Sequence, residues 1–191
     1  MKRGTLATLL VGVGLVLAAI LLYVRPWDAG SSDWAIEWDL TLTGKDGREL
    51  VVSFDEIRQM PSYEGRGGSF SSVGVVSGPF DIAGVPIVDL CELVGGVGDS
   101  DIVFVSAVDG YSAVFDSAQL DGDFDTFAPD TLAPVPHVDM ELVLMYKQDG
   151  QPLTHEFGGP VRVATVGPDD VLTEGHYWVK WVSRIEVMSI N

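Results

Sequence analysis

Few residues in this sequence of 191 could do covalent or metal chemistry. It contains one cysteine, Cys91, and three histidines, His137, His155 and His176. A single cysteine can form no intramolecular disulfide, and it cannot build a multi-cysteine zinc or iron–sulfur site. No serine, histidine and aspartate stand in a recognisable nucleophile-elbow motif, although such triads assemble through space. The residue types therefore give little support to a hydrolase or to a cysteine-based metal site.

The surroundings of Cys91 predict that it is a core residue. Apolar side chains recur at i, i+3, i+4 and i+7 between residues 86 and 94, which is typical of a helix with one buried face. A reactive thiol needs exposure and a cationic neighbour, and the sequence offers neither around Cys91. His137 and His155 stand alone in expected loops, where they are predicted to be solvated.

The charge distribution excludes one class of partner. All 28 acidic residues follow Val24, and the net charge is −17. Nucleic-acid binding depends on clustered lysine and arginine, whereas the four lysines here are scattered from Lys2 to Lys180. We therefore expect no nucleic-acid partner, and the acidic surface would also repel anionic lipid headgroups.

The N-terminus predicts a membrane anchor. Residues 5–24 carry no charge, and at ~1.5 Å per residue they are long enough to cross a ~30 Å hydrocarbon layer as a helix. Lys2 and Arg3 precede this stretch, so the positive-inside tendency places the domain outside the cytoplasm. We predict an anchor over residues 1–25, a spacer over 26–33 and a domain over 34–191, localised to the cell membrane by a single pass. A cleaved signal peptide is the alternative.

The rest of the chain predicts a strand-rich single domain of the α+β class. Ser53 followed by Glu56 predicts a capping box that opens a short helix before Pro61. The glycine-rich residues 61–68 are expected to form a loop, and the acidic, proline-bearing residues 121–137 an irregular surface excursion where function could lie. The predicted strands cover residues 34–42, 49–54, 69–76, 102–108, 111–115, 140–146, 161–165 and 177–188.

Four stretches occur in an order that is more specific than any one of them alone. The first is GVPIVDL at residues 84–90, which leads into the predicted helix, and the second is FVSAVDGYS at residues 104–112. The third combines QDGQPL at 148–153 with GGPVR at 158–162, and the fourth is VKWVSRIE at 179–186. Each has a simpler interpretation as a turn or as core, since Asp-Gly and Gly-Gly-Pro are common turn sequences.

Taken together, these stretches resemble the oxidoreductase molybdopterin-binding domain of the sulfite oxidase family. The resemblance extends over residues 38–188 or so and implies a strand-rich fold of that type. It also implies molybdopterin as a cofactor.

The sequence departs from the family at the metal ligand. The family holds molybdenum on a cysteine some dozen residues before the Gly-Val-Pro segment, and by that register the position is Ser72. A serine hydroxyl holds its proton far more tightly than a thiol, so it is a poor substitute for a soft thiolate ligand. We therefore predict no metal ligand other than a possible Ser72, and we expect molybdopterin to be absent.

The resemblance also implies residues that would hold the cofactor. Arg162 and Lys180 stand where the family lines its pterin pocket, with His176 and Arg184 nearby, and Asp109 and Tyr111 would form the pocket rim. A phosphate dianion in so acidic a protein needs such local cations. The alternative for these cations is an ordinary surface ion pair.

Two functions follow from this sequence. The domain could be an active molybdopterin-dependent redox enzyme or subunit, with Ser72 replacing the cysteine. Alternatively, it is a noncatalytic module that keeps the fold and binds a small molecule or a protein partner through the emptied pocket or the acidic excursion. We favour the second, because the core-forming motifs are retained while the metal ligand is lost.

Overall fold

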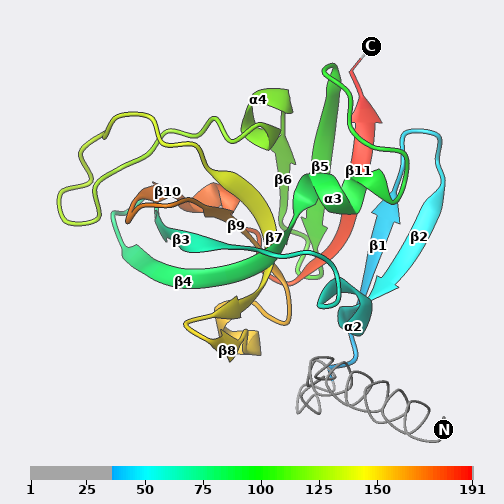
Figure 1. The fold of residues 1–191 in the computed structure, drawn as a ribbon, viewed down its shortest axis with the longest axis horizontal. Helices are drawn as coiled ribbons and strands as arrows, with labels where there is room; N and C mark the ends of the chain where they lie inside the picture. The colour runs from blue at the N-terminus through cyan, green and yellow to red at the C-terminus, as the bar shows by residue number, and fades with distance from the viewer. Residues whose placement is uncertain (1–35, 191) are drawn as a thin grey trace, which may run out of the picture. The chain divides into compact units, whose positions relative to one another are not determined.

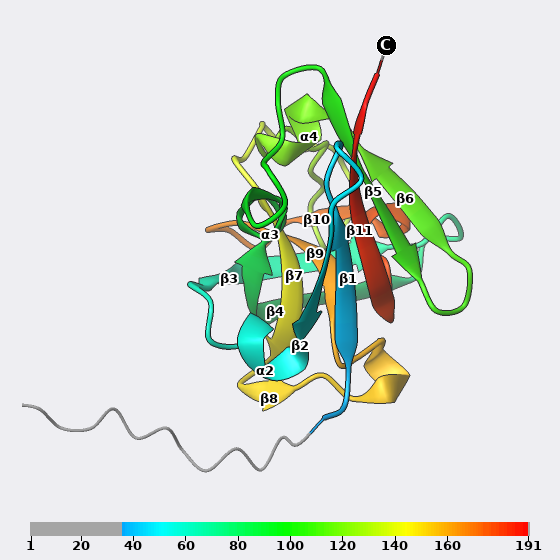
Figure 2. The ribbon, with the colours of Figure 1, turned by 90° about the vertical axis from the view of Figure 1, so that its right-hand side faces the viewer.

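The computed structural model describes residues 36–190, coloured in Figures 1 and 2. The predicted membrane helix, the spacer and the start of the predicted first strand lie outside the described residues. Within the described part of the chain, no helix is long and apolar enough to span a membrane. The described residues form one compact unit, built from two sheets and several short helices.

The first sheet has the strand order β2-β1-β11-β5-β6. Its central strands pair in parallel between β1 and β11 and in antiparallel fashion between β11 and β5. Alternate residues of β5 are buried, which is the period of two expected of a strand packed on one face. The bounds are Asp39–Thr43 for β1, Glu49–Ser53 for β2, Asp101–Ala107 for β5, Ser112–Phe115 for β6 and Val182–Ser189 for β11.

The second sheet has the order β10-β3-β4-β7-β8, and β9 also pairs with β7. Its strands β3 and β4 run across the strands of the first sheet in both views (Figures 1 and 2). A buried cluster that includes Met145, Ala164 and Trp178 packs on this sheet. The bounds are Tyr63–Phe70 for β3, Val76–Pro86 for β4, Glu141–Gln148 for β7, Gln151–Pro152 for β8, Arg162–Val166 for β9 and Leu172–Glu174 for β10.

The helices are short and lie at connections. The capping box is confirmed: Ser53 caps α2, Phe54–Ile57, and the Glu56 side chain returns the hydrogen bond. The predicted second helix is confirmed as α3, Ile87–Glu92, which buries Cys91. The remaining helical turns are α4 at Ser117–Leu120, which the sequence did not predict, η1 at His155–Phe157 and η2 at Gly175–Tyr177.

The glycine-rich loop predicted over residues 61–68 is wrong from residue 63 onward, because Tyr63–Phe70 form strand β3. The glycines serve a close approach between strands. A Cβ on Gly65 would stand 2.6 Å from the carbonyl oxygen of Gly167, and one on Gly67 would collide with the carbonyl oxygen of Thr165. The strand predicted over 69–76 is wrong in its middle: residues 69–70 end β3, residues 71–75 form a turn, and β4 begins at Val76.

The excursion over residues 121–137 is confirmed as irregular, with no named helix or strand in it. It is anchored rather than loose. Phe124 and Thr126 are buried, and Phe127 forms isolated bridges to Pro134 and Leu172. His137 is exposed and lies between the carboxylates of Asp123 and Asp139.

Asp101 ties together three parts of the first sheet. Its carboxylate accepts hydrogen bonds from the Lys45 ammonium at 2.7 Å, the Gly98 backbone N–H at 2.7 Å and the Ser189 hydroxyl at 2.8 Å. The Lys45 side chain, followed by these other donors, lowers the pKa of Asp101 from 3.8 to about 2. A carboxyl whose pKa falls on folding stabilises the fold at pH values above its unfolded pKa.

We predict that Asp101→Asn lowers stability in a pH-dependent manner. The urea midpoint of the variant should lie below that of the wild-type protein at neutral pH. This difference should stay constant down to about pH 5 and close as the pH falls toward 2, because the stabilisation is lost as Asp101 becomes protonated. Urea titrations between pH 7 and pH 3 measure it, and a difference that did not change with pH would contradict this role.

Candidate anion-binding pocket

A cavity of about 640 Å³ opens at one end of the second sheet. The end of β3, the following turn, η1, the start of β9 and the β10–η2 connection line it. Of the five site residues that the sequence suggested, Ser72, Arg162 and Lys180 line this cavity, and so does His176. The fold therefore brings these four residues to one cavity, although Ser72 is far from the other three in the chain.

Arg162, the first residue of β9, is the central cation of the cavity. Its side chain is only 8 % exposed, and its guanidinium lies 5.1 Å from the ring centroid of Trp178. The Nη1 atom donates to the Phe157 carbonyl at 3.4 Å, whereas Nε has no hydrogen-bond partner among residues 36–190. Burial lowers the pKa of Arg162 to about 10. A buried cation that lines a cavity and has no carboxylate partner among residues 36–190 is suited to an incoming oxyanion.

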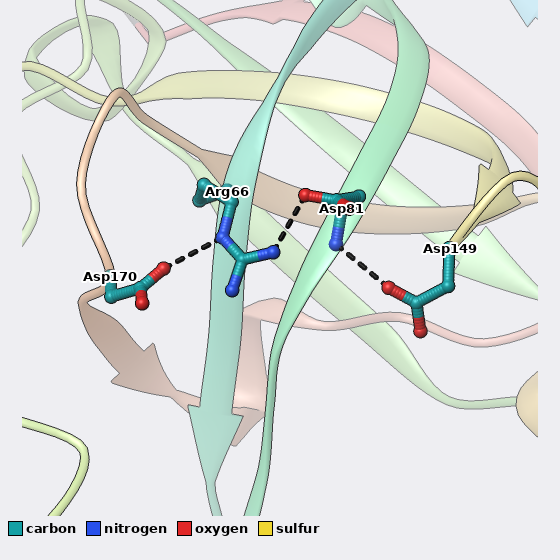
Figure 3. Close-up of polar contacts among 4 residues, drawn as sticks. All are labelled: Arg66, Asp81, Asp149 and Asp170. Carbon is teal, nitrogen blue, oxygen red and sulfur yellow. Dashed lines mark hydrogen bonds and ion pairs between the residues drawn. The ribbon is translucent and has the colours of Figure 1, made fainter.

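Arg66, in contrast to Arg162, forms ion pairs with two carboxylates of the same domain. Figure 3 shows its guanidinium between two carboxylates, with Nε 2.7 Å from Asp170 and Nη1 2.6 Å from Asp81. Asp149 in turn accepts a hydrogen bond from the Asp81 backbone N–H. The Asp170 and Asp81 side chains raise the pKa of Arg66. This cluster joins β3, β4 and two turns, and it leaves Arg66 little capacity for a ligand.

A buried hydrogen-bond chain holds the ring beneath Arg162. The Trp178 indole Nε1–H donates to the Thr173 hydroxyl at 2.9 Å, and the Thr173 and Thr165 hydroxyls lie 2.7 Å apart. Both threonines are 0 % exposed. Since neither hydroxyl can reach water, the chain fixes the orientation of Trp178 and, through it, the place of the guanidinium.

Lys180 reaches the cavity along a closely packed stem. Its Nζ lies 5.7 Å from the ring centroid of Trp181, and its methylenes pack against Gly158. Trp181 has a φ of 51°, which is uncommon for a residue with a side chain, and its backbone N–H donates to the Gly158 carbonyl. Its indole N–H donates to the His155 carbonyl, so η1 and the Lys180–Trp181 pair form one unit.

We predict that Gly158→Ala disturbs this unit. Gly158 has a φ of 90°, and an added Cβ would stand 2.5 Å from Lys180 Cγ. The change should lower the free energy of unfolding by about 1–3 kcal/mol and displace Lys180 from the cavity. Gly150→Ala is the matched control, because Gly150 has a φ of 78° but nothing within 4 Å of an added Cβ. If both variants lost equal stability in chemical denaturation, the Gly158–Lys180 contact would not be the cause.

The predicted rim residues lie beside the cavity rather than in its lining. The Tyr111 hydroxyl donates to the His176 carbonyl at 2.9 Å, which joins Tyr111 to a residue of the lining. Asp109 accepts a hydrogen bond from the Tyr111 backbone N–H within the turn between β5 and β6. Arg184, also suggested as a neighbour, instead binds Glu49 and the Thr43 hydroxyl on the first sheet.

Ser72 lies in the exposed turn between β3 and β4, and this turn borders the cavity. The Gly74 N–H donates to the Ser71 carbonyl, and the Val75 N–H donates to the Ser71 hydroxyl.

Cys91 does not line the cavity: it is buried on α3, and burial raises the pKa of its thiol to about 12. The chain therefore places no thiol at the cavity.

Sequence reasoning missed two carboxylates in the lining. Glu156 on η1 and Glu174 at the end of β10 face the same cavity as Arg162 and Lys180. The Glu174 carboxylate lies 3.2 Å from His176 Nδ1. Glu156 lies between the two halves of the third motif, at residues 148–153 and 158–162, so proximity to that motif was the available signal.

Comparison with known proteins shows the family and the fold. A family model described as "oxidoreductase molybdopterin binding domain" matches residues 70–191. Among solved structures, the sulfane dehydrogenase SoxCD from Paracoccus pantotrophus is similar, with a TM-score of 0.58 and 18% identity over 79% of this chain and 38% of that chain. This chain thus spans well under half the length of that protein. At so low an identity, the similarity shows only that the two proteins share a fold. No curated protein sequence matches the chain.

Proposed function

The chain belongs to the family of oxidoreductase molybdopterin-binding domains, and from this premise we propose that it is a noncatalytic binding module. In this proposal the family's pocket is kept for a small ligand with an oxyanion group. No molybdenum is held on a cysteine.

The single observation that carries the proposal is the state of Arg162. It is buried and faces the cavity, yet no carboxylate of residues 36–190 forms an ion pair with it. An unpaired buried charge is destabilising, so a protein has no structural reason to keep one. A ligand oxyanion would supply the missing partner through charge-assisted hydrogen bonds.

The residues fit only part of the family's cofactor. Arg162 and Lys180 suit an anionic group such as a phosphate. The residues do not fit the molybdenum of the cofactor, because the sole thiol of the chain is buried elsewhere on α3 and Ser72 offers only a hydroxyl. The active-enzyme alternative would require that hydroxyl to serve as the molybdenum ligand.

Metal and pterin analysis tests the noncatalytic part of the proposal. The full-length chain would be produced in a host that synthesises and exports molybdopterin, then purified in detergent. We expect folded protein with molybdenum far below one atom per chain. Molybdenum and pterin near one per chain would contradict the proposal and restore the redox enzyme with Ser72 as a ligand.

A companion variant tests whether Ser72 occupies the family's ligand position. Ser72→Cys places a thiol in the turn that borders the cavity, and a thiolate is the softer and better ligand for such a metal. We expect the variant to retain more molybdenum than the wild-type chain under the same conditions. Ser53→Cys, on the α2 cap, would control for adventitious thiol binding, and equal retention by both variants would count against the register.

The membrane location belongs to the same proposal. It is supported by the uncharged residues 5–24 and by Lys2 and Arg3 before them. Alkaline phosphatase fused after Asn191 is active only outside the cytoplasm, where its disulfides form. We expect an active, membrane-bound fusion; an inactive fusion would contradict the orientation.

A further inference from the structure

The cavity contains unpaired groups of both charges. Neither Arg162 nor Lys180 forms an ion pair with a carboxylate among residues 36–190. Each cation lies over an indole ring instead. Glu156 is exposed and has no hydrogen bond or ion pair to the described residues. Among residues 36–190 the Glu174 carboxylate forms an ion pair only with His176, and both side chains are about half exposed, at 49% and 54%. Cations and carboxylates therefore share one cavity without neutralising one another.

A ligand that carried only negative charge would fit this arrangement poorly. It would meet Glu156 and Glu174 on entering, and it would approach a protein whose net charge is −17. A ligand with a cationic group as well as an oxyanion escapes most of this repulsion, because its net charge is near zero. A cavity of about 640 Å³ is ample for such a small molecule.

We infer that the ligand of this pocket is a zwitterion, whose oxyanion binds Arg162 and Lys180 and whose cationic group binds Glu156 and Glu174. This inference rests on the proposed function, since it names the ligand class of the same site. The lining supports both ends. Arg162 lines the cavity as a buried cation without a carboxylate partner among residues 36–190, whereas the two carboxylates lie on exposed residues that an ammonium group can reach without being desolvated completely.

Two isosteric probes separate the inference from the proposed function. Pentanoate and 4-aminobutyrate have the same chain length and carboxylate, and they differ in a terminal methyl or ammonium group. Binding of each to the full-length chain would be measured by calorimetry at pH 8. We expect 4-aminobutyrate to bind roughly fivefold more tightly, the effect of two partly exposed ion pairs.

The matched variant is Glu156→Gln combined with Glu174→Gln, which keeps size and removes charge. It should weaken 4-aminobutyrate to the affinity of pentanoate, while pentanoate itself binds as well as before or better. Glu64→Gln combined with Glu141→Gln, outside the cavity, should change neither. Equal affinities for the two probes in the wild-type chain, or a preference that survived the Glu156/Glu174 change, would overturn the zwitterion and leave the oxyanion pocket standing. If neither probe bound, both the proposed function and this inference would fail.

Discussion

Replacing Arg162 with methionine is expected to weaken oxyanion binding strongly while leaving the protein as stable as before, or more stable. Methionine fills much of the same volume without a charge. We expect the affinity for pentanoate to fall by roughly one to two orders of magnitude, the usual effect of losing charge-assisted hydrogen bonds. Calorimetric titration of the full-length chain measures this loss.

The stability half of this prediction follows from the sign of the pKa change. Burial lowers the pKa of Arg162 to about 10, so folding disfavours the charged form. At neutral pH the Arg162 side chain is charged in both the folded and the unfolded protein, so the full free-energy cost of burying the charge is present. This cost would be relieved only as the pH rises above about 10. Removing the charge should raise the free energy of unfolding by about 1 kcal/mol, since the lost contact with Trp178 offsets part of the gain.

Arg184→Met is the control for Arg162→Met. Arg184 is partly exposed and bound to Glu49 and Thr43 on the first sheet, so its removal should leave pentanoate binding unchanged. A strongly destabilised Arg162→Met protein whose binding matched the wild type would show that Arg162 serves the fold and not a ligand.

Replacing Thr173 with valine is expected to be among the most destabilising single changes in the domain. Valine preserves the shape but removes the acceptor of the Trp178 indole N–H and the partner of the Thr165 hydroxyl. Both stranded groups are buried, so the free energy of unfolding should fall by about 3 kcal/mol. Urea denaturation measures the change, and pentanoate binding should weaken with it because Trp178 supports Arg162.

Two further variants show whether the hydroxyl is the cause. Thr173→Ser keeps the hydroxyl and loses only a methyl group, so it should retain most of the stability. Thr165→Val combined with Thr173→Val should lose less than the two single changes added together, since each removes a partner of the other. A Thr173→Ser protein as unstable as Thr173→Val would assign the effect to packing instead.

Local signals in the sequence predicted local structure well. The Ser53–Glu56 capping box and the apolar spacing around Cys91 depend on residues three or four apart, and the structure confirms both. The glycines of β3 were misread because their reason is not local. Gly65 and Gly67 allow the chain around Gly167 and Thr165, a hundred residues away, to come close, and a glycine-rich stretch on its own favours a loop.

The pocket was predictable to a similar extent. Resemblance brought Ser72, Arg162 and Lys180 together, and the structure places all three at one cavity. It did not indicate that Asp109 lies only in the adjoining turn, nor that Glu156 and Glu174 face the cations. Nor could spacing reveal the Thr165–Thr173–Trp178 chain, since hydrogen bonds between buried side chains depend on how the strands and η2 are placed in space.

The most direct test of the central claim observes Arg162 itself. The Nε–H group of a buried arginine gives a proton–nitrogen NMR signal, which the Arg162→Met variant would assign by its loss. On titration of the full-length chain with pentanoate, we predict that this signal shifts saturably while those of Arg66 and Arg184 stay in place. A pocket that binds no oxyanion would leave the Arg162 signal unmoved at every concentration, and that result would contradict the account.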